Sequence, residues 1–175
     1  MALYIPAPPA PYVFPGISSL IEAANYAEKK NYTNFGGTAT EDTPYTRVLT
    51  LEDGSITGAS LSAGRVVLPA GYYWCSFYSV AYQTETNRAA LRNNGTGAAI
   101  IMGSTNKADG TGDDQAPSVG AGFFNLSAGA TVELMHDQNR TQNSSGKGIG
   151  SNSNGWTTDS EYFARLSLIR FGDTK

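Results

Sequence analysis

Leu68-Pro69-Ala70-Gly71 is followed by Tyr72-Tyr73-Trp74-Cys75-Ser76-Phe77-Tyr78-Ser79-Val80-Ala81-Tyr82. The first four residues are typical of a turn, and the next eleven have the aromatic and β-branched side chains that strands favour. Side chains alternate along a strand, so one face holds Tyr72, Trp74, Tyr78, Val80 and Tyr82, and the other holds Tyr73, Cys75, Phe77 and Ala81. Both faces are therefore apolar, and each must be buried against another part of the chain or another subunit. We expect the Tyr73 face to lie in a sandwich core and the Trp74 face to lie nearer a subunit interface.

The composition indicates one all-β domain. The chain has 175 residues, 20 glycines and only 15% charged residues, which is typical of short strands joined by turns. The net charge of −3 and the lack of a clustered basic face argue against nucleic acid as a partner. The N-terminus lacks the pattern of a signal peptide, and no apolar run reaches the length of a membrane span. Cys75 is interpreted as a small buried apolar side chain.

The first 40 residues differ from the rest. Residues 1–16 contain five prolines among apolar side chains, which predicts an extended arm that docks on a partner. From Ile17 to Lys30 an apolar stripe with a capping box at Ser19 and Glu22 predicts a short helix. We therefore divide the chain into an attachment or oligomerisation segment, 1–40, and a jelly-roll domain, 41–175. The side chains expected to bind the partner are Leu3, Tyr4, Ile5, Tyr12, Val13 and Phe14.

Strands follow one another from residue 44 onward. Apolar alternation between turn signals predicts them at 45–51, 65–68, 71–82, 86–93, 98–103, 116–126, 130–138, 147–152 and 160–171. Nine strands in one domain must cover their edges, and a two-sheet antiparallel jelly-roll sandwich does so.

Three segments resemble the superfamily of the complement globular head and tumour necrosis factor. The family's Gly-x-Tyr-x-Phe strand is similar to Gly71, Tyr73, Cys75 and Phe77, with cysteine where the family has an aromatic residue. The segments 118–134 and 162–170 are similar to later strands of the family. The segment 66–73 is also similar to bacteriophage members of this superfamily, which are capsid decoration proteins, head fibres and fibre tips. Arg65 departs from the complement family, which has phenylalanine there.

The resemblance implies a homotrimer, and the last strand independently indicates one because it also has apolar side chains on both faces. The alternative is that residues 1–40 of the same chain cover the second face. For the trimer we expect an interface formed by Trp74, Tyr78, Tyr82, Phe163, Ile169 and Phe171.

The sequence offers little for catalysis. His136 is the single histidine, it alternates with Val132 and Leu134 on one strand face, and no second histidine or cysteine completes a zinc site. The acidic segment 109–114 is interpreted as a solvated turn, with calcium binding as the alternative. We therefore expect no enzyme activity, no cofactor and no metal. A glycosidase is the weakest alternative, using a pair among Asp109, Asp113, Asp114, Glu133, Asp137 and Glu161.

These observations lead to a functional hypothesis. The expected protein is a virion surface protein, a trimeric decoration or cement protein bound to the major capsid protein or another virion protein, made in the host cytoplasm without a signal peptide. The alternative is the tip of a phage fibre that binds a receptor or a host-surface glycan, with exposed aromatic residues such as Tyr82 or Trp156 stacking on sugar rings.

Overall fold

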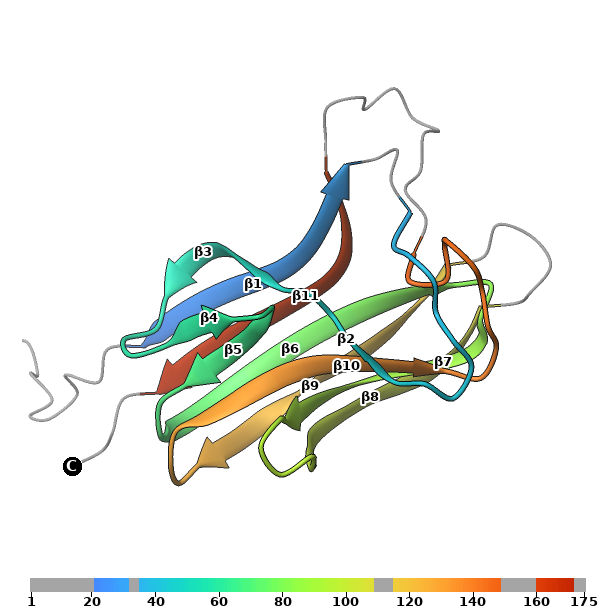
Figure 1. Cartoon of the computed structure of the whole chain (residues 1–175). Coiled ribbons are helices and arrows are strands. Elements are labelled where there is room, and N and C mark those ends of the chain that lie inside the picture. Colours follow the sequence, from blue (N-terminus) through green and yellow to red (C-terminus); the bar gives the residue numbers. More distant parts are fainter. Residues whose placement is uncertain (1–20, 32–34, 109–114, 149–159, 172–175) are drawn as a thin grey trace, which may run out of the picture.

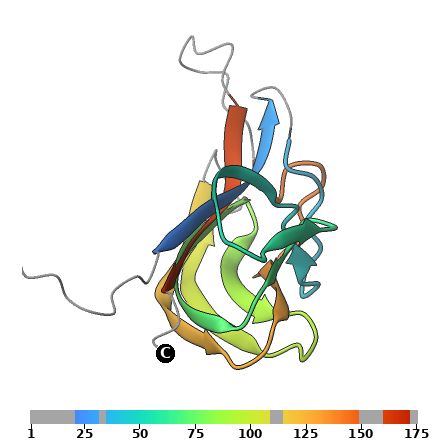
Figure 2. The same cartoon turned by 90° about the vertical axis from the view of Figure 1, so that its left-hand side faces the viewer.

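The computed structural model describes residues 21–31, 35–108, 115–148 and 160–171 as two antiparallel sheets packed face to face, with no helix among these residues (Figures 1 and 2). The strands, in chain order, are β1 (Glu22–Asn31), β2 (Tyr45–Thr46), β3 (Thr50–Ser55), β4 (Ser60–Ser62), β5 (Arg65–Leu68), β6 (Gly71–Tyr82), β7 (Glu85–Asn93), β8 (Ala99–Ala108), β9 (Gln115–Leu126), β10 (Ala130–Gln138) and β11 (Ser160–Phe171).

The first sheet has the order β3-β1-β11-β6-β9, and the second has β4-β5-β10-β7-β8, with β2 pairing β10 beyond the end of β5. Chain neighbours therefore lie in opposite sheets at several points, as in a jelly roll. The expected all-β, two-sheet antiparallel sandwich is confirmed. Among the described residues no helix is long and apolar enough to cross a membrane.

The core lies between the two sheets. From the first sheet it receives Tyr73, Cys75, Phe77, Leu166 and Leu168, and from the second it receives Val66, Leu68, Leu91, Val132 and Leu134. Burial of this apolar surface is the main favourable contribution to folding.

The helix expected over 17–30 is wrong wherever the structure describes that segment. From Glu22 onward the chain forms β1, which pairs with β11 on one side and with β3 on the other. Ala24 and Tyr26 are buried in the core, with 1% and 3% of their surface exposed. The period-two alternation of these two residues and the ladders on both sides override a helix propensity of only a few tenths of a kcal/mol per residue. The sandwich therefore includes residues that precede position 41.

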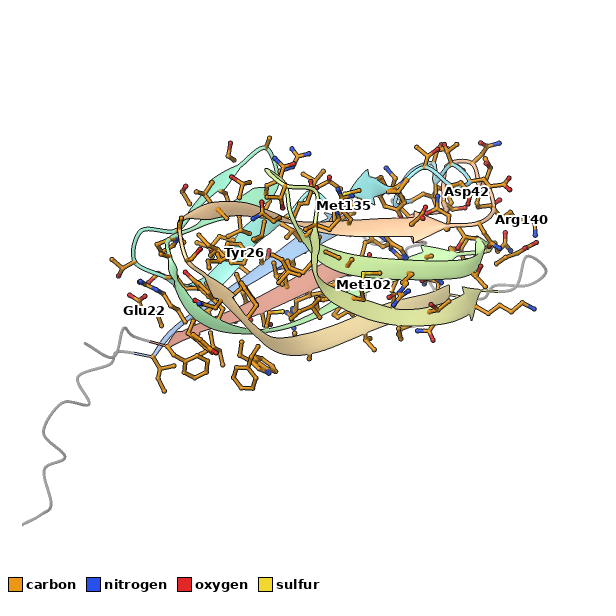
Figure 3. All side chains as sticks on the ribbon, turned by 90° about the horizontal axis from the view of Figure 1, so that it is seen from below. Glu22, Tyr26, Asp42, Met102, Met135 and Arg140 are labelled. Carbon is orange, nitrogen blue, oxygen red and sulfur yellow. The ribbon has the colours of Figure 1, made fainter. Side chains whose placement is uncertain are left out.

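The two ends of the sandwich differ in what covers them. In Figure 3 Glu22 and Tyr26 mark one end, where β1 begins, and Asp42 and Arg140 mark the other. At this second end, which we call the loop end, residues 35–44 lie against residues 138–148, with Ala39 bridging to Gln142 (Figure 1).

Candidate functional site

The outer face of the first sheet carries the apolar side chains that have no place in the core. Along β6 the residues Tyr73, Cys75 and Phe77 are buried, with 0%, 0% and 5% of their surface exposed, as predicted. Trp74 and Tyr78 point to the opposite face and are partly exposed. Burial raises the pKa of the Cys75 thiol to about 12, so this side chain stays protonated and acts as a small apolar group.

A cluster on this outer face, which we call the aromatic patch, comprises Tyr72, Trp74, Phe123, Ile169 and Phe171. Trp74 lies between Phe123 of β9 and Ile169 of β11, and Tyr72 lies opposite Phe171. The rings of Phe123 and Phe171 have their centroids 6.0 Å apart. Tyr72 and Phe123 are 57% and 66% exposed, so the patch is apolar and open to solvent. Exposed clusters of this kind mark interaction sites.

Phe123 was not among the residues predicted for this face. The segment that contains it was predicted as a strand, but its position opposite Trp74 depends on the register between β6 and β9. Period-two alternation from Phe124, which is buried, would have placed Phe123 on the outer face.

The loop end covers two of the six residues that were predicted for a trimer interface. Phe163 is 1% exposed and packs tightly against Gly148, where an added Cβ would overlap its ring. Tyr82 is 6% exposed, and its amide donates to the carbonyl of Gly146. These two side chains are therefore already buried within one chain, whereas Trp74, Tyr78, Ile169 and Phe171 remain on the outer face of the first sheet.

Several predicted site residues lie outside the described residues. They are the arm residues Leu3, Tyr4, Ile5, Tyr12, Val13 and Phe14, the acidic segment 109–114, and Trp156. Of the other acids, Glu133 is ion-paired with Arg65 at 2.8 Å, and Asp137 lines the groove described next. Within the described ranges no group of three or more His, Cys, Asp or Glu side chains is placed to hold a metal ion.

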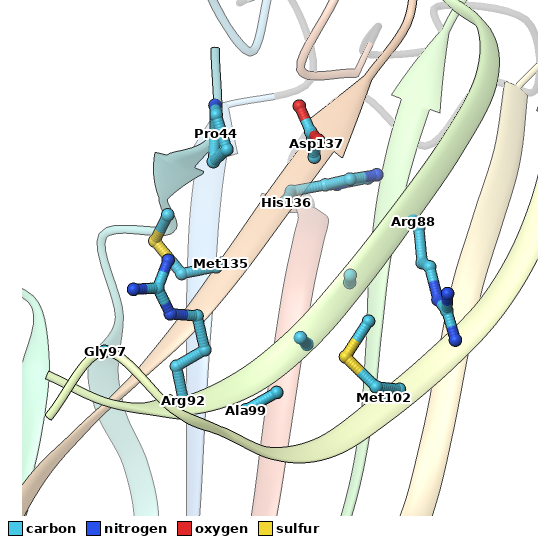
Figure 4. Close-up of a pocket in the computed structure, with 11 residues that line it drawn as sticks. Pro44, Arg88, Arg92, Gly97, Ala99, Met102, Met135, His136 and Asp137 are labelled. Carbon is cyan, nitrogen blue, oxygen red and sulfur yellow. The ribbon is translucent and has the colours of Figure 1, made fainter. Parts of the chain in front are cut away.

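The outer face of the second sheet contains a groove made of two adjoining depressions of about 330 Å³ and about 180 Å³. Arg88 and Asp137 line both depressions. The larger one has an apolar floor that includes Met102 and Met135, and Figure 4 shows Arg92 beside Met135 and Arg88 on the side of Met102. The smaller one is lined by polar residues, among them Asp42, Thr86, Thr105, Gln138 and Asn139.

Arg88 has the means to bind a ligand in this groove. Its Nε donates to the carbonyl of Gly103 at 3.0 Å, which holds the guanidinium in place. The β7–β8 pairing shifts register between Arg88 and Ala90 and again between Leu91 and Arg92, and such bulges change the direction of the side chains beside them. The groove therefore offers two guanidinium groups around an apolar floor, next to several hydroxyl, amide and carboxylate groups.

A third feature is a chain of buried polar groups between the sheets near the loop end. Ser79 Oγ lies 2.6 Å from His136 Nδ1, and His136 Nε2 lies 3.0 Å from Asn87 Oδ1. This order resembles a nucleophile, a base and an orienting group. However, Ser79 and His136 are 0% exposed, and the guanidinium of Arg47 donates to the Ser79 oxygen at 2.7 Å. The arrangement thus holds the serine oxygen as an acceptor in the interior rather than presenting it to a substrate.

Taken together, the sheet order, the antiparallel pairing and the enclosed core define a jelly-roll fold of the tumour necrosis factor type. The sequence matches no model of a protein family, and no curated protein matches it significantly.

Solved structures, in contrast, match the fold over most of the chain. Murine APRIL at pH 5.0 is 10% identical, with a TM-score of 0.54, and the match covers 86% of this chain and 98% of that one. Eiger TNF from S. frugiperda is 13% identical, with a TM-score of 0.55, and the match covers 89% and 95%. At these identities the likeness establishes the fold alone, a jelly roll like that of tumour necrosis factor proteins.

Proposed function

We propose that this protein is a structural surface protein of a bacteriophage particle. It is a homotrimer of jelly rolls that binds the major capsid protein, or another virion protein, through its N-terminal arm. It acts on the virion surface without catalysing a reaction. The observation that carries the proposal is the aromatic patch, an open apolar surface on a sandwich whose core is already complete.

The patch supports self-association. Its residues come from the three neighbouring strands β11, β6 and β9, so the patch is part of a continuous sheet face. Aromatic side chains are enriched in the buried centres of subunit interfaces. In a closed ring each copy uses the same surfaces, which buries the patch without leaving an open, aggregating edge.

The position of Ile21, from which the N-terminal segment continues, supports attachment at the same end of the molecule as the patch. Strand β1 begins at Glu22, and its second residue, Ala23, pairs with Ile169 of the aromatic patch. Ile21, directly before this strand, is 68% exposed. The chain that precedes Ile21 therefore joins the sandwich beside the patch. Three such arms in one trimer would add their weak contacts through avidity.

Light scattering on the full chain tests the trimer. We expect a mass three times 18.5 kDa, and a monomer at all concentrations would overturn the self-association step. Deletion of residues 1–16 tests the attachment step. The truncated protein is expected to keep the trimer mass and to lose cosedimentation with capsids, and undiminished capsid binding would contradict the role of the arm.

A second candidate function is that of a glycan-binding fibre tip, and the groove on the second sheet favours it. The polar half has side chains that commonly bind sugar hydroxyls, and Arg88 at its centre suits a carboxylate. A glycan array with the full chain tests this function. A hit that is lost in Arg88→Ala and kept in Arg140→Ala would support it, because Arg140 lies outside the residues that line the groove. An array without hits would exclude glycan binding for the sugars displayed.

A further inference from the structure

The single histidine of the chain is fully buried and held as a neutral ring. Asn87 Nδ2 donates to the carbonyl of Asn106 at 3.3 Å, so its Oδ1 is free to accept from His136 Nε2. The proton of the imidazole is thereby fixed on Nε2. His136 Nδ1 is then the acceptor, and the Ser79 hydroxyl donates to it over 2.6 Å.

Arg47 faces the same nitrogen. Its Nη2 lies 3.1 Å from His136 Nδ1, and its Nε donates to Ser79 Oγ at 2.7 Å. A second proton on the imidazole would occupy Nδ1, place two cations side by side and remove the acceptor that both donors use. At a 0% exposed position, water cannot compensate for either loss.

The groups around this pair give a protonated imidazole no anion to bind. Glu28 of β1 already neutralises Arg47, whose Nη1 lies 3.4 Å from its carboxylate, and Lys30 lies 3.9 Å from the same side chain. Tyr45 of β2 stacks on the imidazole with centroids 5.6 Å apart, and the ammonium of Lys147 lies 4.3 Å from the Tyr45 ring centroid. The surroundings therefore hold three cationic side chains and one carboxylate.

The remaining nearby carboxylate does not change this balance. Asp137 follows His136 on β10, so strand alternation places it on the outer face of the sheet, where it lines the groove. From β7 and β6 the imidazole meets only the neutral side chains of Asn87 and Ser79.

The same network holds the loop end together. Arg47 donates to the backbone carbonyls of Val80 on β6 and Lys147 in the loop, the latter at 2.8 Å. Gly148, next to Lys147, packs against Phe163, and its carbonyl accepts a hydrogen bond from the amide of Gly36. Arg47 therefore connects the first sheet, the second sheet and the loop end.

We propose that Arg47, Ser79, Asn87 and His136 form an acid-sensitive lock, and that protonation of His136 at acidic pH opens the loop end while the apolar core stays folded. The opening requires no ligand other than the proton. The chain has no other histidine, so no second imidazole titrates at the opposite end.

The direction of the pH effect follows from the environment of the ring. Burial, followed by the charge of Arg47, lowers the pKa of His136 well below its usual 6.5. The unfolded chain takes up a proton near pH 6.5, whereas the folded chain does so only at lower pH. The lock therefore stabilises the folded chain fully above about pH 6.5, and this stabilisation decreases as the pH falls. The unfolding equilibrium constant rises by up to about tenfold for each pH unit below that value.

Denaturant unfolding between pH 7.5 and pH 5.0, at fixed ionic strength and protein concentration, tests the lock. The wild-type chain is expected to lose stability with the slope just given, and His136→Gln is expected to have a flat profile because glutamine keeps a polar side chain but does not titrate. Val66→Ala, a core substitution at the opposite end of the sandwich, is the control: it lowers stability at every pH and keeps the slope. A flat wild-type profile, or an unchanged slope in His136→Gln, would overturn the proposal.

Hydrogen exchange of the wild-type chain at pH 5.5 and pH 7.5, corrected for intrinsic rates, locates the opening without any variant. Peptides that cover 79–82 and 142–148 are expected to lose protection at pH 5.5, and peptides that cover 66–68 and 124–126 are expected to keep it. Equal protection at both pH values in the first pair, or a loss spread evenly over all four, would contradict a local lock.

Discussion

Trp74 and Phe123 lie directly opposite each other on β6 and β9, on the outer face of a sheet whose inner face is already packed. Phe123 is 66% exposed, and Trp74 is only partly covered by its neighbours in the chain. Two aromatic side chains placed this way add nothing to the core of the monomer. They lie where the proposed subunit interface would cover them.

Trp74→Glu is therefore expected to break the trimer before it unfolds the protomer. A carboxylate at the centre of the patch would be buried without a partner in the assembled state, at a cost of several kcal/mol per copy. In the monomer it would remain at the surface. Light scattering should give 18.5 kDa, and circular dichroism should keep the strand signal.

Met102→Glu is the matched control for Trp74→Glu. It introduces the same charge at an apolar side chain that is 47% exposed, but on the outer face of the second sheet. We expect this variant to keep the trimer mass. Dissociation by both variants alike would place the interface elsewhere or make the effect one of net charge.

Gly120→Ala is expected to destabilise the protein although it adds a single methyl group. Gly120 lies opposite Phe77 on the neighbouring strand, and a Cβ at this position would overlap the Phe77 ring. Overpacking of this kind costs about 1 to 3 kcal/mol. Thermal unfolding would measure the loss, with Gly95→Ala as the control, because a Cβ there makes only an ordinary contact with Asn93 at 3.4 Å. Equal melting temperatures for the two variants would show that the ring moves aside freely.

The Cys75 thiol is expected to be inert in the folded protein. It is 0% exposed, and burial raises its pKa to about 12, so neither access nor thiolate is available at pH 8. A disulfide reagent should release no chromophore from the native chain and one equivalent in guanidinium chloride. Rapid native labelling would mean that β6 opens readily, in conflict with its pairing to β9 and β11 along its length.

The strands that the sequence predicted best are those with clear apolar alternation. The bounds of 65–68, 71–82, 130–138 and 160–171 agree with the structure because each strand alternates core and outer residues along its length. Strand β1 was predicted as a helix because of its apolar stripe and the capping box at Ser19 and Glu22, and its alanines, lysines and glutamates favour a helix over a strand. Its pairing with β3 and β11 overrides that preference. The strand β4 was missed because its three residues are all exposed.

Predicting the site residues depended even more than predicting the strands on contacts between segments that are distant in the sequence. Trp74, Tyr78, Ile169 and Phe171 were predicted for the outer face from alternation alone, and the structure leaves them there. Tyr82 and Phe163 share the same alternation, but the loop end covers them. Arg47 gave no sequence signal of burial, because a lone charged residue in a strand pattern is normally solvated, and its partners lie 19 to 100 residues away.

Arg47→Met is expected to cost about 3 kcal/mol of stability, because removing one partner of a buried ion pair leaves the Glu28 carboxylate with only the partly exposed Lys30, 3.9 Å away. Methionine fills much of the volume of the arginine stem, but it leaves Glu28, the Ser79 hydroxyl and the Val80 carbonyl without their donor. Glu28→Gln in the same background should recover part of the loss, since an uncharged amide is cheaper to bury than a lone carboxylate. A double-mutant cycle from urea unfolding measures this coupling. If the two losses of free energy simply add, Glu28 and Arg47 do not stabilise each other, and the hydrogen bonds of Arg47 to Ser79 and Val80 account for its contribution.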